Sequence, residues 1–181
     1  MTPKKALFLD RDGNLVHDGH HTCEPDQISL ITGVKEALYA CMKADYLLFI
    51  VTNQSGIGRG IFTWDQYKAC HARMLELLEL PQPGFIDVCV APEHPEQPSV
   101  YRKPSPKFIL ECIARYQLDP RACWMIGDRR TDWQAGLNAG IRSCAVRSGA
   151  PFREGDELYA QESGILVHTD FPSFVRDTLL L

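Results

Sequence analysis

The stretch Leu7-Phe8-Leu9-Asp10-Arg11-Asp12-Gly13-Asn14 indicates both the type of fold and the position of a functional site. Three apolar residues lead directly into two aspartates and a glycine, which is the pattern of a buried strand that ends at a polar loop. In an open α/β sheet, groups at the carboxyl end of a strand face the crevice where such folds bind ligands. Asp10 and Asp12 are therefore candidate functional residues, although a helix cap or a solvated turn uses the same residue types.

The spacing of these two aspartates also points to a cation. Side chains two residues apart can face the same way if the backbone stays extended through Arg11. Two close carboxylates repel each other, and a hard divalent ion with oxygen ligands relieves that repulsion. The simplest expectation is Mg²⁺.

Composition excludes several classes of protein. The 181 residues carry a net charge of −4, so the basic surface typical of a nucleic-acid binder is not expected. No apolar stretch is long enough for a signal peptide or a membrane span. The seven cysteines are scattered and odd in number, which indicates free thiols in a reducing cytoplasm rather than disulfides. We expect one cytoplasmic domain covering residues 1–181.

Strand and helix patterns alternate along the chain. Continuous apolar runs predict further strands at 46–51, 85–91, 124–126, 143–146 and 165–167. Between them, helices are predicted at 33–44, 63–80, 105–116 and 132–140, with a last helix capped by Asp170. This alternation predicts an α/β fold with a doubly wound parallel sheet and helices on both faces. No segment between strands is long enough for an inserted cap domain.

Three loops stand out at the expected ligand-binding edge. The loop 14–32 is long and polar, and the segment from Pro92 to Pro106 is too rich in proline for regular structure. The glycines of 56–60 do not fit a dinucleotide fingerprint, because the third comes one place early, and they favour a flexible loop over the crevice.

Polar residues follow four of the predicted strands. They are Asp10 and Asp12, then Thr52 and Asn53, then Arg102 and Lys103, and finally Asp128 and Asp132. Parallel strands bring all their carboxyl ends to one edge of the sheet, so these groups can converge. Carboxylates, a hydroxyl and a lysine at one crevice suit phosphoryl transfer, in which positioning and charge neutralisation supply most of the catalysis.

The order of these motifs resembles that of the haloacid dehalogenase superfamily of phosphohydrolases. The resemblance rests on Asp10-Arg-Asp-Gly13, Val51-Thr52-Asn53, Lys103 and Gly127-Asp128-x-x-x-Asp132, and it spans residues 5–146. It implies that Asp10 is the nucleophile that forms an aspartyl-phosphate, and that Asp12 acts as acid and then as base. It also implies that Mg²⁺ binds Asp10, the main-chain carbonyl of Asp12 and Asp128.

The same resemblance assigns supporting roles. Thr52 and the backbone around Asn53 would hold the phosphate, and Lys103 would neutralise charge on the nucleophile and the transition state. Asp132 would support the metal ion, although a helix N-cap is an alternative for this residue.

Within the superfamily, the chain is similar to the capless branch that contains heptose 1,7-bisphosphate 7-phosphatases and the histidinol-phosphatase domain. The shared residues include Thr52-Asn-Gln-Ser-Gly56 and Arg102-Lys-Pro104. This similarity implies a monomeric phosphatase for a small sugar phosphate, such as a lipopolysaccharide precursor. The candidate substrate-binding residues are Asp18, His20, His21, Thr52, Asn53, Gln54, Ser55, Arg102, Lys103 and Arg129. For the two arginines, a solvated rim is the alternative, and for the histidines an ordinary polar surface.

One departure from that branch concerns a zinc loop. The relatives carry Cys-x-His and Cys-x-Cys before Arg-Lys-Pro, whereas this chain has Ala91, Glu93, Ser99 and Tyr101 at those positions. These side chains cannot form a structural zinc site with nitrogen and sulfur ligands, so no zinc is expected. The altered loop leaves three alternatives open for function: a histidinol-phosphate phosphatase, a broad small-molecule phosphatase, or a non-catalytic phosphate-binding module.

Overall fold

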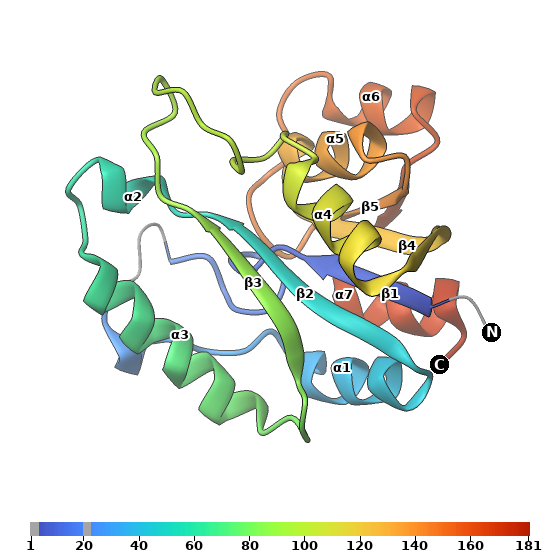
Figure 1. The fold of residues 1–181 in the computed structure, drawn as a ribbon, viewed down its shortest axis with the longest axis horizontal. Coiled ribbons are helices and arrows are strands. Elements are labelled where there is room, and N and C mark those ends of the chain that lie inside the picture. Colours follow the sequence, from blue (N-terminus) through green and yellow to red (C-terminus); the bar gives the residue numbers. More distant parts are fainter. Residues whose placement is uncertain (1–3, 20–22) are drawn as a thin grey trace.

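The sheet is built from six parallel strands in the order β3-β2-β1-β4-β5-β6 (Figure 1). The structure is a computed structural model that describes residues 4–19 and 23–181. The strands are β1 (Lys4–Leu9), β2 (Tyr46–Asn53), β3 (Phe85–Ala91), β4 (Leu118–Gly127), β5 (Arg142–Val146) and β6 (Leu166–His168). The predicted α/β fold with a parallel sheet is confirmed.

Helices cover both faces of this sheet because side chains alternate along the central strand. Leu7 and Leu9 of β1 face one core, and Ala6 and Phe8 face the other. The first core is completed by α1 (Val34–Lys43), α3 (Trp64–Leu78) and α7 (Phe171–Phe174), with a π-helical turn at Val175–Leu179. The second is completed by α4 (Lys107–Tyr116) and α5 (Arg130–Asn138). Beside α5 lies α6 (Asp156–Glu162).

The strand order fixes where a ligand can bind. The chain moves outward from β1 through β2 to β3, and then returns to the other side of β1 at β4. Doubly wound sheets bind ligands in the crevice at this switch point, outside the carboxyl ends of the two strands. Asp10 follows β1 and Asp128 follows β4, so both lie at that crevice.

Several helix ends follow the sequence signals, and others differ by a few residues. The side chain of Thr63 accepts a hydrogen bond from the main-chain N–H of Gln66, which forms a capping box at the predicted start of α3, and Asp170 caps α7. The predicted start of the helix at residue 105 is two residues too early, because α4 begins at Lys107 after Pro106. The strand predicted at 124–126 is longer, since β4 already pairs with β1 at Leu118.

Most of the glycine-rich segment belongs to a short helix rather than to the flexible loop that was predicted. This helix, α2 (Ser55–Gly58), packs closely against its surroundings. A Cβ on Gly56 would lie 2.1 Å from the Phe62 ring, and one on Gly58 would lie 2.5 Å from the main-chain oxygen of Pro92. These glycines therefore permit close packing and dock α2 against the loop 92–106, which has no regular structure, as predicted.

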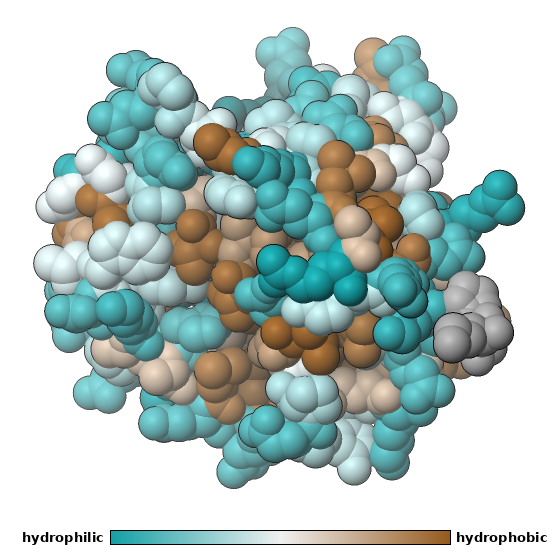
Figure 2. Space-filling view, viewed as in Figure 1, coloured by the Kyte–Doolittle hydropathy of each residue, from teal (hydrophilic) through white to brown (hydrophobic). Residues whose placement is uncertain are grey.

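The face of the molecule over β3 carries apolar and polar side chains side by side (Figure 2). Most residues of this edge strand are only half-buried. In the described part of the chain, no helix is both long and apolar enough to cross a membrane. The cysteines are all free thiols, and six of the seven are buried.

Candidate active site

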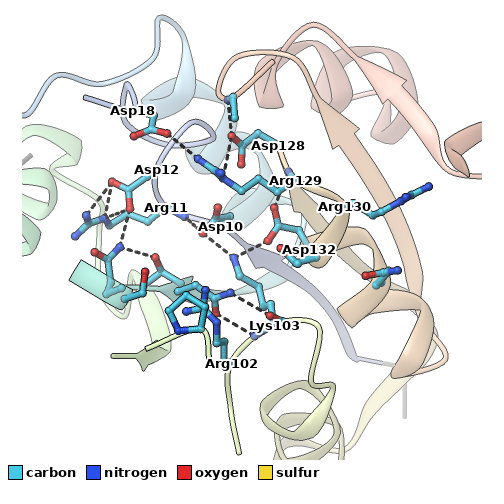
Figure 3. A pocket seen from close by; sticks show the side chains of 18 of the residues that line it. Asp10, Arg11, Asp12, Asp18, Arg102, Lys103, Asp128, Arg129, Arg130 and Asp132 are labelled. Atoms are coloured by element: carbon cyan, nitrogen blue, oxygen red, sulfur yellow. Dashed lines mark hydrogen bonds and ion pairs between the residues drawn. The ribbon is translucent and has the colours of Figure 1, made fainter. Parts of the chain in front are cut away.

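A cavity of about 730 Å³ lies at the carboxyl edge of the sheet (Figure 3). It brings together almost all of the residues that the sequence singled out. Those lining it are Asp10, Asp12, Asp18, Thr52, Asn53, Gln54, Ser55, Arg102, Lys103, Asp128, Arg129 and Asp132. The two remaining candidates, His20 and His21, lie outside the described residues.

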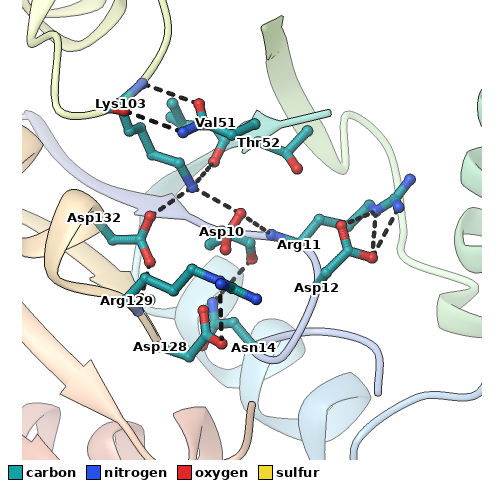
Figure 4. A network of polar contacts seen from close by, with 12 residues as sticks. Asp10, Arg11, Asp12, Asn14, Val51, Thr52, Lys103, Asp128, Arg129 and Asp132 are labelled. Carbon is teal, nitrogen blue, oxygen red and sulfur yellow. Dashed lines mark hydrogen bonds and ion pairs between the residues drawn. The ribbon is translucent and has the colours of Figure 1, made fainter. Parts of the chain in front are cut away.

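The centre of the site is an ion pair between Asp10 and Lys103 (Figure 4). The Nζ of Lys103 lies 2.8 Å from Oδ1 of Asp10, and it also donates to the main-chain oxygen of Val51 at 2.7 Å. Asp10 Oδ1 accepts a second hydrogen bond, from the main-chain N–H of Arg11 at 2.8 Å. Both charged side chains are buried, so each is held by the other in a fixed geometry.

Asn53 fixes the backbone of Lys103. Its Oδ1 accepts from the main-chain N–H of Lys103 at 3.0 Å, and its Nδ2 donates to the main-chain oxygen of the same residue at 3.1 Å. The end of β2 is thereby joined to the loop 92–106, which has no regular hydrogen-bonding pattern of its own. The lysine is thus positioned by its backbone as well as by its ammonium group.

Asp132 links the lysine to helix α5. It is the third residue of the helix rather than the N-cap that the sequence offered as an alternative. Its Oδ2 accepts from the main-chain N–H of Arg129 at 2.9 Å, and its Oδ1 lies 2.7 Å from Nζ of Lys103. One carboxylate therefore closes the first turn of the helix and shares the buried lysine with Asp10.

Asp128 presents a free carboxylate oxygen to the same centre. Its Oδ2 accepts from the main-chain N–H of Ala150 at 2.6 Å, whereas its Oδ1 is buried without a hydrogen-bond partner among the described residues. Asp10, Asp128 and Asp132 each offer an oxygen, and these atoms lie within 4.8 Å of one another. Three converging carboxylates, one of them with an unsatisfied oxygen, fit a hard divalent cation such as Mg²⁺.

The pKa values of these groups reflect the same excess of negative charge. Burial raises the pKa of Asp10, although Lys103 opposes it, and the other carboxylates of the site raise it further. Burial also raises the pKa of Asp128 to about 6, with Asp132 contributing. Burial alone would lower the pKa of Lys103, but Asp10 and Asp132 outweigh it and raise that pKa. One buried lysine cannot neutralise this set of carboxylates, so the site favours an additional cation.

Asp12 lines the same cavity as Asp10, but its carboxylate is bound by different side chains. Its carboxylate is held by Arg11, whose Nη2 lies 2.8 Å from Oδ1, and by Gln54, whose Nε2 donates to Oδ2 at 2.7 Å. Figure 4 shows the carboxylate turned toward Arg11. Asp12 remains at the wall of the cavity, with 27% of its side chain exposed.

Arginines form the rim of the cavity. Arg129 pairs with Asp18 at 3.1 Å, which ties the loop after β4 to the loop after β1. Arg102 is half-buried, and its side-chain Nη1 donates to the main-chain oxygen of Glu93 at 3.4 Å. Burial lowers the pKa of Arg102, and the nearby Glu93 carboxylate opposes this effect. No ion pair between Arg102 and a carboxylate is formed among the described residues, and its side chain lines the cavity.

Some contributors to the site were not predicted. Arg11 is buried against Asp12 and the ring of Tyr67, and Asn14 donates to the main-chain oxygen of Asp10 at 3.1 Å. Both belong to the opening motif, so their position in it was the available signal. The loop that carries Ala150 follows β5, and the rule that ligands bind at strand ends would have included it.

The sequence is similar throughout to curated bacterial phosphatases. A D-glycero-beta-D-manno-heptose-1,7-bisphosphate 7-phosphatase from Pasteurella multocida is 38% identical over 171 residues, covering 87% of this chain and 89% of the relative. The chain belongs to the haloacid dehalogenase superfamily of phosphatases. A D-glycero-D-manno-heptose-1,7-bisphosphate 7-phosphatase from Chlorobaculum tepidum is 32% identical, covering 99% of this chain and 92% of the relative. The HAD-hydrolase-like family model matches residues 100–172.

Solved structures of this superfamily share the fold. A D,D-heptose 1,7-bisphosphate phosphatase from B. bronchiseptica, crystallised with magnesium and phosphate, has a TM-score of 0.82 at 28% identity and covers 97% of this chain and 98% of its own. A HAD-superfamily hydrolase from Ehrlichia chaffeensis has a TM-score of 0.61 at 14% identity, over 99% of both chains, which shows the fold alone. The resemblance expected from the four motifs is confirmed, and the protein is a phosphatase.

Proposed function

We propose that this phosphatase is a Mg²⁺-dependent phosphomonoester hydrolase of a small sugar phosphate, most similar to the D-glycero-D-manno-heptose 1,7-bisphosphate 7-phosphatases. The observation that carries the proposal is the buried centre in which Asp10 is paired with Lys103 beside the unsatisfied Oδ1 of Asp128. This centre presents a fixed nucleophile, a neutralising cation and a position for a metal ion at one point.

In the first step, a carboxylate oxygen of Asp10 attacks phosphorus, and the bond from phosphorus to the substrate oxygen breaks. Asp12 donates a proton to that oxygen, so that the product leaves as an alcohol. Lys103 stabilises the negative charge of the transferring phosphoryl group, and the hydroxyl of Thr52 donates to one of its oxygens. A covalent aspartyl-phosphate on Asp10 results.

In the second step, Asp12 is a carboxylate and accepts a proton from an incoming water. The water oxygen bonds to phosphorus, the bond from phosphorus to Asp10 breaks, and inorganic phosphate leaves. Mg²⁺, bound by Asp10, the main-chain carbonyl of Asp12 and Asp128, would reduce the repulsion between the nucleophile and the phosphate dianion, and Asp132 would support it.

The mechanism is tested with Asp10→Asn and with the metal. Asp10→Asn should abolish phosphate release while leaving the circular dichroism spectrum unchanged, because the amide is a poor nucleophile of the same shape. Mg²⁺ should raise the thermal midpoint of the wild-type protein, since a ligand that binds only the folded state stabilises it. In Asp128→Asn this shift should shrink strongly. Wild-type turnover in Asp10→Asn would overturn the mechanism.

The cavity supports a polyol with a second phosphate. Its volume, about 730 Å³, lies in the range of small-molecule sites. Arg102 lines this cavity and forms no ion pair within the described part of the chain, and a guanidinium group matches the geometry of a phosphate. We therefore assign Arg102 to the distal phosphate of a bisphosphate, with Arg129 and its partner Asp18 on the other side of the opening.

A phosphate-release panel tests the substrate. Heptose 1,7-bisphosphate should be hydrolysed with a higher kcat/KM than histidinol phosphate or nucleotides. Arg102→Gln should raise KM for the bisphosphate and have less effect on a monophosphate. Preference for histidinol phosphate, or similar rates for all compounds, would replace the heptose assignment by one of the alternatives. No turnover with any compound would contradict the assigned chemistry.

We further propose that the loop 92–106 works without zinc. Protein contacts replace a metal: the main-chain N–H of Gly58 donates to the oxygen of Pro92 at 2.9 Å, and that of Arg102 donates to Oγ of Ser99 at 3.0 Å. Tyr101 donates to Glu111 of α4 at 3.3 Å. Elemental analysis of the purified protein should find less than stoichiometric zinc, and one tightly bound zinc per chain would contradict the proposal.

A further inference from the structure

Gln54 lies between two groups to which the proposed mechanism gives separate roles. It follows β2, is only 6% exposed, and its main-chain N–H donates to the oxygen of Ala91 at 2.7 Å. Its side-chain Nε2 donates to Oδ2 of Asp12 at 2.7 Å and to Oγ1 of Thr52 at 2.8 Å. One buried amide therefore contacts both the acid-base carboxylate and the phosphate-binding hydroxyl.

The chemistry of these contacts fixes the orientation of the amide. A carboxylate that carries its charge can only accept hydrogen bonds, so the atom facing Asp12 must be the nitrogen. An amide nitrogen has two N–H groups, and here one is directed to Asp12 and the other to Thr52. Both donors are thus used inside the protein, which leaves the nitrogen of Gln54 without a donor for substrate.

The same contact orients the hydroxyl of Thr52. Because Oγ1 accepts from Gln54, the hydroxyl proton must point elsewhere, and Thr52 lines the cavity. A phosphate oxygen bound at Lys103 would accept a hydrogen bond from that hydroxyl. At the other end, Gln54 and Arg11 together engage both oxygens of Asp12, so the carboxylate has one defined direction.

We propose that Gln54 is a positioning residue that orients Thr52 toward the phosphate and Asp12 for proton transfer to the leaving group. This inference rests on the proposed mechanism, and it replaces the substrate-binding role that the sequence suggested for Gln54. Its consequence is specific, because loss of the amide should impair protonation of the leaving group more than binding of the substrate.

A comparison of leaving groups tests this role in Gln54→Met, which keeps the length of the side chain but has no N–H. Heptose 1,7-bisphosphate leaves as an alcohol that needs a proton, whereas p-nitrophenyl phosphate leaves as a phenolate that needs little help. General acid catalysis contributes about 10²–10⁴-fold, so the ratio of the two kcat/KM values should fall about tenfold or more in the variant. An unchanged ratio would overturn the inference.

A double-mutant cycle with Asp12→Asn gives a second, independent readout. If Gln54 acts through Asp12, Gln54→Met should reduce kcat/KM for heptose 1,7-bisphosphate, whose leaving group needs a proton, less in the Asp12→Asn protein than in the wild type. An equal reduction in both backgrounds would mean that Gln54 acts separately from Asp12, and would overturn the proposal. Gln54→Asn, whose shorter amide cannot reach both partners, provides a second variant that should show the same change in ratio.

Controls separate this inference from the proposed function. Gln161→Met makes the same substitution at an exposed position of α6 and should leave both kcat/KM values unchanged. If Asp10→Asn keeps wild-type turnover, the mechanism itself fails. If Asp10 is essential but Gln54→Met lowers kcat/KM equally for both substrates, only the role of Gln54 fails.

Discussion

Lys103 is held in the site through both its side chain and its backbone. Its ammonium group is shared by Asp10 and Asp132, and its backbone is bonded on both sides by Asn53. Burying a charge is costly unless it is paired, and here the pairing groups are themselves part of the chemistry. The lysine is therefore in position before a substrate arrives, which is the condition for efficient electrostatic stabilisation of a transition state.

Replacing Asn53 by alanine should release the backbone of Lys103. The variant should lose both hydrogen bonds, costing roughly 1–3 kcal/mol for the buried groups left unpaired, and kcat should fall because the ammonium group is no longer fixed. Urea unfolding and turnover of p-nitrophenyl phosphate measure the two effects. Asn138→Ala is a matched control, since Asn138 donates to the neighbouring Pro104 oxygen from an exposed position. Unchanged kcat in Asn53→Ala would contradict the role.

His71 should make the folded state sensitive to acid. Burial lowers its pKa to about 4, from an ordinary value of 6.5, and the nearby Arg11 acts in the same direction. Between these values the unfolded chain binds the proton more readily than the folded protein, so stability is lost as pH falls from about 6.5 toward 4.

His71→Phe should therefore lose less unfolding free energy between pH 7 and pH 4 than the wild type. The substitution keeps a ring against Tyr67, on which His71 stacks with centroids 5.7 Å apart. Urea unfolding at several pH values measures the difference, and contributions from Asp10 and Asp128 are common to both proteins and cancel. If the unfolding free energies of the two proteins change in parallel with pH, His71 is not the source of the acid sensitivity.

At the scale of elements, α2 shows that a local sequence pattern does not reveal which residues a segment will pack against. The glycines of 56–60 suggested a flexible loop, whereas Gly56 and Gly58 lie in a helix and allow close contact with Phe62 and with the backbone of Pro92. Similarly, the apolar runs predicted every strand, and β4 was underestimated because its first residues gain their pairing only from β1. Arg11 was missed because a charged residue is expected at the surface unless a buried partner is known. Its partner Tyr67 lies far away in the sequence, on α3.

Gly58→Ala tests the docking of α2. The added Cβ would lie 2.5 Å from the oxygen of Pro92 and 2.9 Å from the main-chain nitrogen of His94, and backbone atoms cannot easily move aside. We expect a loss of about 1–3 kcal/mol of stability and a higher KM for the bisphosphate, because the loop carrying Arg102 shifts.

The control for this prediction is Gly60→Asn. Gly60 has φ +68 and no atom within 4 Å of a Cβ, and asparagine tolerates that conformation better than other residues. This variant should keep the wild-type KM. Gly58→Ala with wild-type KM and stability would show that the close approach is not required.

At the scale of the whole molecule, the parallel sheet explains why residues far apart in sequence meet. Thr52 lies near the end of β2, and Asp10, Lys103 and Asp128 come after β1, β3 and β4, so no local pattern links these four residues. The rule for strand ends was sufficient to gather them at one edge, whereas the direction of each side chain was not predictable. Asp12 illustrates this, since its carboxylate is bound by its neighbour Arg11 and by Gln54, which follows another strand.

The expectation that residues 1–181 form one monomeric domain leads to a further prediction. Urea unfolding should show a single transition, with the same midpoint by tryptophan fluorescence and by circular dichroism. The three tryptophans suit this test, because Trp64 lies on α3, Trp124 on β4 and Trp133 on α5. Separate midpoints would indicate more than one folding unit, and light scattering of the same sample tests the monomer.

The bonds between Asn53 and Lys103 also have a consequence for engineering. They anchor the last part of the loop 92–106 to β2, so the geometry of the lysine does not depend on the residues before it. Residues 93–101 can therefore be exchanged as a graft from another family member, including one with a zinc loop, without moving the lysine. Chimeras of this kind offer a direct route to new substrate preferences with an unchanged arrangement of Asp10 and Lys103.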